Sequence, residues 1–225
     1  MDYLRVIWTV ARKDLLIEMR TRERVAAMGS FVVLVGVLFN YSIDTTIVRP
    51  QEIAPGIIWV TIIFGGLLGM GRTFHLEEED GAFSGVLQSP IPLDALYLGK
   101  SAANLVILGL VTGLTFMVFG VFFNLAFGPH PFVLLTVVVL ALLGFVALST
   151  LFSAMSARTT MGESLLPVLV FPLLIPMVIF SVNATTRLFA GRPVSEVTGS
   201  VRMLGAFAIL SVAAGAVLFR HIVEE

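Results

Sequence analysis

Long apolar stretches follow one another along the chain, separated by shorter polar connections. Each is close to the roughly 20 helical residues that cross a hydrocarbon core about 30 Å thick. None holds a charged residue in its interior, which is typical of segments that contact lipid. The stretches are Val25–Ile43, Ile53–Gly71, Ser101–Phe127, Phe132–Met155, Leu165–Asn183 and Val201–Phe219. They predict an all-α polytopic membrane protein with six transmembrane helices in a single domain, residues 1–225.

The fifth stretch is the least regular, because it contains Pro167, Pro172 and Pro176. A proline inside a helix removes a backbone donor and frees a carbonyl, which neighbouring helices must satisfy in lipid. We therefore expect these three prolines to kink the fifth helix and to pack it against its neighbours.

The segment before the first span, residues 1–24, predicts an amphipathic helix. Its apolar residues recur at spacings of three and four, and its basic residues fall largely elsewhere around the helix. The apolar set is Leu4, Ile7, Trp8, Ala11, Leu15 and Met19. A helix with tryptophan on its apolar side is suited to lie in the membrane interface as an elbow. A signal-anchor flank or a calmodulin-like target is the alternative.

The connection between the second and third spans, residues 72–100, has a dense acidic cluster followed by apolar residues at helical spacing. These residues are Glu77, Glu78, Glu79, Asp80, Phe83, Val86 and Leu87. Pro90 and Pro92 end this short helix, and Asp94 is the predicted N-cap of the next one. A short helix with an exposed apolar face is typical of a docking element. A solvated acidic loop that only separates two spans is the alternative.

The placement of lysine and arginine predicts the orientation, since these residues gather on the cytoplasmic side. With the N-terminus inside, ten of the 14 basic residues are cytoplasmic. The cytoplasmic set is Arg5, Arg12, Lys13, Arg20, Arg22, Arg24, Arg72, Lys100, Arg158 and Arg220. The outer set is Arg49, Arg187, Arg192 and Arg202. Both termini are therefore predicted to be cytoplasmic.

Composition agrees with a bilayer environment. Of the 225 residues 57% are hydrophobic and 13% charged, against about 25% charged in soluble domains. The mean hydropathy is +0.99. A net charge of −1 gives no reason to expect a nucleic-acid partner. The absence of cysteine excludes disulfides, thiolate metal sites and covalent haem attachment.

The sequence contains few residues that could form a catalytic, metal-binding or ligand-binding site. Gly99-Lys100-Ser101 resembles the end of a phosphate-binding loop, but Asp94 stands where the motif needs a glycine. The spans carry no paired histidines or carboxylates, so neither a catalytic nor a metal site is predicted. His130 is a candidate haem ligand, although a lone histidine in a loop is more often only solvated. Polar residues within the spans, such as Asn104, Thr112, Thr115 and Ser149, are expected to bridge helices.

Three motifs narrow this architecture to a family. They are Ile53-Ala54-Pro55-Gly56-Ile57-Ile58-Trp59-Val60; then Glu79-Asp80-Gly81 followed by Leu87-Gln88-Ser89-Pro90-Ile91-Pro92 and Gly99-Lys100; and the proline-punctuated Leu166–Pro176. With these motifs and the predicted topology, the chain resembles the membrane subunits of ABC-2 (type V) exporters. More narrowly, it resembles the CcmB family of haem exporter permeases of cytochrome c maturation. The N-terminal region and residues 183–200 carry no family signature.

The resemblance implies a non-catalytic, multi-pass subunit of the bacterial inner membrane, present in two copies in its complex. It implies an ATP-binding partner (CcmA-like), CcmC-like and CcmD-like membrane proteins, and a haem chaperone (CcmE-like). ATP bound by the partner would drive haem export or release of the loaded chaperone. Haem is then a candidate substrate, and no cofactor is assigned to this chain. The segment 74–87 would be the coupling helix that docks on the ATPase.

Two other functions fit the same pattern. One is an ABC-2 permease that exports a lipid, polysaccharide or drug. The other is a membrane scaffold without transport activity. A membrane-embedded enzyme is disfavoured, because the spans lack paired acidic or histidine residues.

Overall fold

The structure is a computed structural model that describes residues 3–44, 48–74, 85, 91–157 and 162–224. In this part of the chain the regular elements are all helices, which confirms the predicted all-α class. They are α1 (Tyr3–Thr21), α2 (Glu23–Ser42), α3 (Pro50–Met70), α6 (Leu93–Phe122), α7 (Pro131–Ala157), α8 (Gly162–Phe189), the 3-10 helix η1 (Val194–Glu196) and α9 (Thr198–Glu224).

Six of these helices, α2, α3, α6, α7, α8 and α9, are long and apolar enough to cross a membrane. This confirms the six spans predicted from the apolar stretches. All six spanning helices begin before the predicted borders, and two of the extensions are the longest. The third spanning helix begins at Leu93 rather than Ser101, and the fifth continues to Phe189 rather than Asn183.

Lys100 and Arg187 mark polar borders in the sequence, yet each lies within a helix. Lys100 is buried and pairs with Asp14, whereas Arg187 is 42% exposed near the end of α8 and keeps its contact with solvent. The N-cap prediction for Asp94 is wrong. Pro92 is the N-cap of α6, and Asp94 lies in the first turn of that helix.

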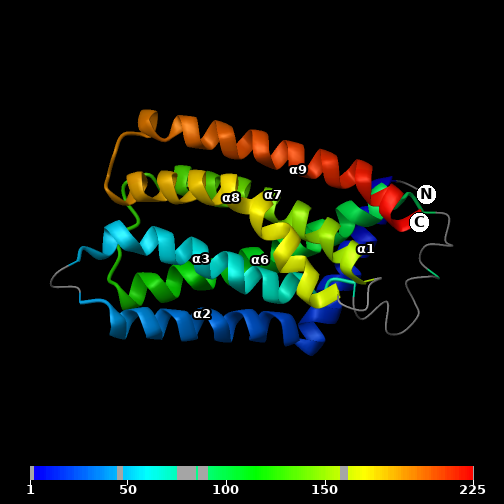
Figure 1. Ribbon diagram of the computed structural model, residues 1–225, viewed down its shortest axis with the longest axis horizontal. Helices are drawn as coiled ribbons and strands as arrows, with labels where there is room; N and C mark the ends of the chain where they lie inside the picture. The colour runs from blue at the N-terminus through cyan, green and yellow to red at the C-terminus, as the bar shows by residue number, and fades with distance from the viewer. Residues whose placement is uncertain (1–2, 45–47, 75–84, 86–90, 158–161, 225) are drawn as a thin grey trace.

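The spanning helices run side by side along the long axis of the molecule (Figure 1). Both chain ends lie at one end of the bundle, where residues 71–74 leave α3 and residues 91–92 enter α6. The connections α2–α3, α6–α7 and α8–α9 lie at the opposite end. An even number of crossings therefore places both termini on the same side.

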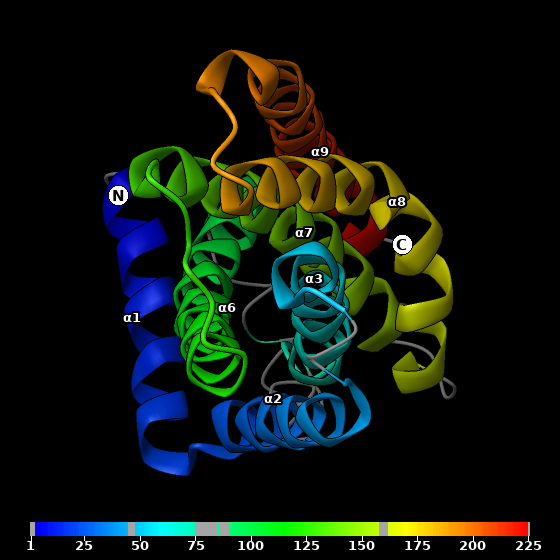
Figure 2. The same ribbon diagram turned by 90° about the vertical axis from the view of Figure 1, so that its left-hand side faces the viewer.

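Two helices form the centre of the bundle, as the end-on view of Figure 2 shows. α3 and α7 are the most buried spans, and α2, α6, α8 and α9 surround them. Small residues admit close neighbours here: the side chain of Met28 on α2 occupies the space beside Gly69 on α3. The aromatic ring of Phe145 on α7 lies against Gly66 in the same way.

A buried hydrogen bond joins α3 to α8 within this core. Trp59 is fully buried, and its indole Nε1 donates to Thr185 Oγ1 at 3.0 Å. An indole N–H in an apolar environment is costly without a partner. This bond therefore fixes the second half of α8 against the central helix.

α1 differs from the other long helices because it runs across the side of the bundle instead of along it (Figure 2). The apolar residues of this predicted amphipathic helix lie in two different environments. Ala11 is buried against the bundle and Ile7 is half-buried, whereas Leu4, Trp8 and Met19 are exposed. The reason is that α1 packs along α6, which removes one side of its apolar set from the surface.

Pro167, Pro172 and Pro176 all lie inside α8, which is one continuous helix. The helix changes direction along its length, as its yellow first part and gold second part show in Figures 1 and 2. A change of direction is what helix-interior proline produces. The assignment of this bend to the three prolines stays a prediction.

Candidate functional site

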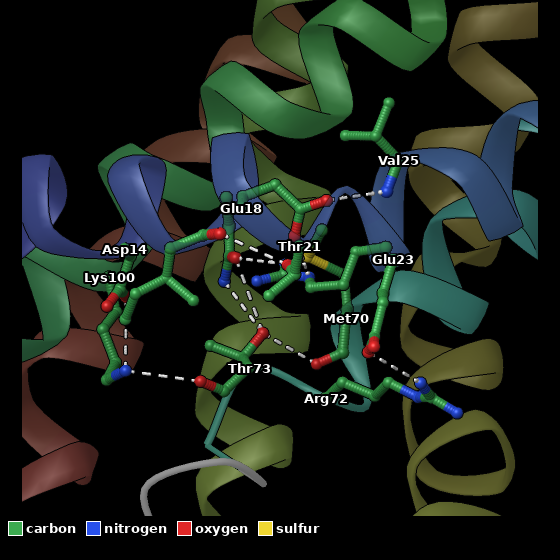
Figure 3. Close-up of polar contacts among 12 residues, drawn as sticks. Asp14, Glu18, Thr21, Glu23, Val25, Met70, Arg72, Thr73 and Lys100 are labelled. Carbon is green, nitrogen blue, oxygen red and sulfur yellow. Dashed lines mark hydrogen bonds and ion pairs between the residues drawn. The ribbon is translucent and has the colours of Figure 1, made fainter.

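A buried polar network lies at the end of the bundle that holds both termini (Figure 3). Two helices supply most of it with polar residues one turn apart on facing surfaces. α1 contributes Asp14 and Glu18, and α6 contributes Lys100 and Asn104. Residues four apart project from the same side of a helix, so both pairs can meet across the interface.

Lys100 is the most deeply buried charged residue among those described, with 1% of its side chain exposed. Its Nζ lies 3.2 Å from Asp14 Oδ2 and donates to the backbone oxygen of Thr73 at 3.3 Å (Figure 3). It also lies 4.6 Å from the ring centroid of Phe74, within cation–π range. A buried ammonium group is tolerated only with such partners. Lys100 thus joins α1 and the segment that leaves α3 to α6.

The residue before it explains how α1 approaches so closely. A side chain at Gly99 would place its Cβ 2.7 Å from Val10 Cβ and 2.9 Å from the backbone oxygen of Ile7. Only glycine lets the α1 backbone reach α6 at this point. The Gly99-Lys100 pair therefore has a structural explanation: the glycine admits α1 and the lysine binds Asp14.

Both the oxygen and the nitrogen of the Asn104 side-chain amide form hydrogen bonds. Its Oδ1 accepts from Arg24 Nη2 at 2.6 Å, and its Nδ2 donates to Thr73 Oγ1 at 3.2 Å and to Thr150 Oγ1 at 3.0 Å. Thr73 in turn donates its hydroxyl to the backbone oxygen of Met70 at 2.8 Å. The amide has two donor hydrogens, and both are bound. The prediction that Asn104 bridges helices is confirmed, since it connects α2, α7 and the segment after α3. It is not confirmed for the other three residues: within the described chain Thr115 bonds to Val111 of its own helix, and the hydroxyls of Thr112 and Ser149 have no hydrogen-bond partner.

A second ion pair holds the corner between α1 and α2. Glu18 Oε2 lies 4.0 Å from Arg24 Nε, and Glu18 Oε1 accepts from the backbone N–H of Val25 at 2.9 Å. A carboxylate at a helix N-terminus is favourable because the free N–H groups there carry partial positive charge. Arg22 forms the corner with a left-handed φ of 57°. The turn between the two helices is thereby fixed.

The N-terminal end of α1 is attached to α6 as well. Tyr3 donates its hydroxyl to Asp94 Oδ2 at 2.8 Å. Desolvation, followed by this hydrogen bond, raises the pKa of Tyr3. Contacts from Tyr3 to Glu18 thus fix α1 along most of its length.

The buried polar network is suited to hold several helices together as one rigid unit. It joins five elements at the point where the chain leaves α3 for the long connection to α6. Within the described residues no three His, Cys, Asp or Glu side chains lie close enough to hold a metal ion. His130, the candidate haem ligand, lies just before α7, where its backbone oxygen accepts from Val133 and Leu134.

The residues predicted to dock on an ATPase are Glu77, Glu78, Glu79, Asp80, Phe83, Val86 and Leu87. All seven lie outside the described residues, so this prediction stays untested, as do the functional boundaries 1–24 and 72–100. The described part of the second range includes the start of α6, because residues 93–100 are helical.

Sequence reasoning missed the network itself. The sequence pattern does not distinguish Asp14 and Glu18 from the other charges of the N-terminal helix, and it marks Lys100 as a basic residue of the inner side and part of a family motif, with no predicted partner. The one available signal was spacing, since Asp14 with Glu18 and Lys100 with Asn104 are each four residues apart. That spacing does not reveal which two helices face each other.

A bundle of six apolar helices, with a transverse amphipathic helix locked to it by a buried polar network, defines a polytopic integral membrane protein. The sequence profile of the CcmB family, described as CcmB protein, matches residues 5–224. The chain belongs to the CcmB family.

Its relatives carry one name. The heme exporter protein B of Escherichia coli K12 is 31% identical over 206 residues, which cover 89% of this chain and 90% of that protein. Its counterpart from Paracoccus denitrificans is 36% identical over 145 residues, 63% of this chain and 64% of that protein. The counterpart from Pseudomonas aeruginosa is 29% identical over 190 residues, which cover 83% of this chain and 82% of that protein. The matched length therefore falls just below two thirds of the Paracoccus protein.

Proposed function

We propose that this chain is the membrane permease subunit of an ABC transporter complex for cytochrome c maturation. In this role it couples ATP hydrolysis by a partner to haem export or to release of a haem-loaded chaperone. The observation that carries the proposal is the CcmB family match over residues 5–224, with relatives named heme exporter protein B. The six-span fold agrees with it.

The proposed partners follow from the same match. They are an ATP-binding subunit (CcmA-like), CcmC-like and CcmD-like membrane proteins, and a haem chaperone (CcmE-like), with two copies of the permease in the complex. The chain itself is proposed to be non-catalytic. Haem is proposed as the substrate of the complex rather than as a resident cofactor.

The proposed location is the bacterial inner membrane with both termini cytoplasmic. Two observations support this orientation. The basic residues favour the N-terminal side by ten to four. Both chain ends, residues 71–74 that follow α3 and residues 91–92 that precede α6 lie at one end of the bundle (Figure 1).

The α3–α6 connection is proposed to dock on the ATPase through Phe83, Val86 and Leu87, with the acidic residues 77–80 meeting basic groups. The buried network supports this proposal, because Lys100 and Asn104 hold Thr73 at the root of the connection. Force applied beyond Thr73 would then reach α6, α7 and α1 together. Docking helices transmit motion when they are continuous with rigid elements.

The direct test is complementation in a bacterium that lacks its own permease gene, scored by covalent haem in a c-type cytochrome. Affinity purification from detergent should recover an ATP-binding subunit and a haem chaperone. Recovery of the ATPase without restored cytochrome would favour an exporter of another substrate. Restored cytochrome in a strain that also lacks the ATPase would favour a scaffold.

The docking surface has a sharper test. The double variant Phe83→Asp/Val86→Asp should lose the co-purified ATPase by about tenfold or more, because two buried apolar anchors are replaced by charges. Membrane insertion should be unchanged. The matched control is Tyr41→Asp, which changes an 87%-exposed residue at the opposite end of the bundle. Normal ATPase recovery with the double variant contradicts the proposed docking surface.

A further inference from the structure

The transverse helix α1 has an uneven distribution of charge. It contains four basic residues, Arg5, Arg12, Lys13 and Arg20, and two acidic ones. Both acidic residues point into the bundle: Asp14 pairs with Lys100, and Glu18 with Arg24. Their negative charge is therefore used inside the protein, where it compensates buried cations.

The outer face keeps the positive charge. Arg5, Arg12 and Arg20 are all exposed, and in the described part of the chain no ion pair joins them to a carboxylate. Lys13 is partly exposed and pairs with Asp14 Oδ1 at 3.2 Å. The result is a surface that is basic although the whole chain has a net charge of −1.

Apolar side chains share this face with the arginines. Leu4, Trp8 and Met19 are 71%, 67% and 70% exposed. Arg5 and Arg12 lie three residues before and four residues after Trp8, so the three form one stripe along the helix. Exposed apolar side chains beside arginine are typical of a helix that lies among lipid headgroups.

The position of α1 brings this stripe to the bilayer boundary. α1 lies at the edge of the bundle and transverse to the spans (Figure 2). It packs along the first turns of α6, from Asp94 to Lys100. α6 has 30 residues, more than the roughly 20 that cross the hydrocarbon core, so its first turns lie near the headgroups.

We propose that the outer face of α1 binds anionic phospholipid in preference to zwitterionic phospholipid. Guanidinium groups of Arg5, Arg12 and Arg20 bind the headgroup phosphates, and Trp8 lies between headgroup and acyl chain. The argument is charge complementarity, because each basic residue near an anionic surface favours such lipid on the order of fivefold. Zwitterionic headgroups offer no net attraction of this kind.

The chain contains its own reporter for this contact. Its two tryptophans are Trp8, which is on the proposed surface, and Trp59, which is fully buried. The purified full-length protein is placed in vesicles that contain either brominated phosphatidylglycerol or brominated phosphatidylcholine at equal mole fraction. Bromine quenches a tryptophan only at short range. The difference between the wild type and Trp8→Phe gives the quenching of Trp8 without altering the core.

Brominated phosphatidylglycerol should quench Trp8 at least about twofold more than brominated phosphatidylcholine, because the anionic lipid is enriched there. The triple variant Arg5→Gln/Arg12→Gln/Arg20→Gln should lose this preference. The matched control Arg49→Gln/Arg202→Gln removes exposed arginines elsewhere and should keep it. The wild type provides a test without substitution: raising salt from about 0.1 M to about 1 M shortens the screening length from about 10 Å to about 3 Å and should abolish the preference.

Equal quenching of Trp8 by the two lipids at low salt overturns the proposal. A preference that persists in the triple variant or at high salt also overturns it, since the arginines are then not its cause. Loss of all Trp8 quenching in the purified complex would show that a partner protein covers this face instead of lipid, which overturns it as well.

Discussion

The two ends of the bundle are stabilised in different ways. At the end that holds both termini, Lys100 and Asp14 form a buried ion pair with 1% and 11% of their side chains exposed, and their atoms lie 3.2 Å apart. At the opposite end, Arg187 and Glu196 form a pair at 3.9 Å with 42% and 38% exposed. The first joins residues 86 positions apart, whereas the second joins the last turn of α8 to the α8–α9 connection, nine positions on.

The difference in burial between the two ion pairs indicates which of them influences how the helices pack. An exposed pair in one connection gains little, because water solvates both partners almost equally well. A buried pair is not a strong source of stability either, since desolvation opposes the attraction. Its effect is on specificity: an arrangement that separates α1 from α6 leaves charges without partners. The buried network therefore selects one placement of α1.

The largest effect should come from breaking the buried pair. Asp14→Asn removes the carboxylate that lies 3.2 Å from the buried Lys100 ammonium and should destabilise the protein by about 3–5 kcal/mol. Thermal unfolding of the purified protein in detergent measures the change. The double variant Asp14→Asn/Lys100→Met removes both charges and should recover most of the loss. If the double variant is no more stable than Asp14→Asn, the lost attraction between these two charges is not the cause.

At the opposite end of the bundle, the largest loss of stability should come from substitution of a tightly packed glycine. Gly128 has a φ of +78°, and a Cβ there would overlap the backbone oxygen of Leu188 on α8. Gly128→Ala should therefore cost more than the roughly 1–2 kcal/mol of left-handed strain alone. Gly191→Ala is the matched control, because Gly191 has a φ of +68° and no atom within 4 Å of the added carbon in the described chain. Equal losses in thermal stability would show that crowding by Leu188 contributes nothing.

The smallest effect should come from the exposed pair. Glu196→Gln removes the ion pairs of Glu196 with Arg187 and Arg192. Exposed pairs are worth about 0–1 kcal/mol, so unfolding should shift only slightly, and less at high salt. Arg187 keeps its hydrogen bond to the backbone oxygen of Glu196 at 2.8 Å. A loss comparable to that of Asp14→Asn would contradict the contrast between the two ends.

The spans could be predicted from the sequence because the bilayer imposes a length and a polarity on each one. The same reasoning failed where the protein interior replaces lipid. Lys100 was treated as the polar border of a span, but it lies inside α6 because Asp14 compensates its charge. The apolar set predicted for α1 did not separate Ala11, which faces the bundle, from Leu4 and Trp8, which are exposed. Both depend on which helix packs against α1, and local spacing carries no such information.

The motifs were more informative about family than about mechanism. Gly99-Lys100 contributed to the resemblance to the CcmB family before its physical role was visible. The role emerges only from the packing of α1 on α6, because Val10 and Ile7 surround Gly99. The docking residues between Glu77 and Leu87 remain a prediction from sequence pattern alone.

The hydrogen bond from Trp59 to Thr185 has a consequence for biogenesis. Its two partners are 126 residues apart in the chain, so α3 is synthesised and inserted well before α8 exists. Until then the indole N–H of Trp59 lacks its native acceptor, and the central helix is incompletely bonded. Lateral assembly of the bundle can therefore finish only after the fifth span has left the insertion machinery. A truncated chain that ends before Thr185 should be a preferred substrate for membrane quality control.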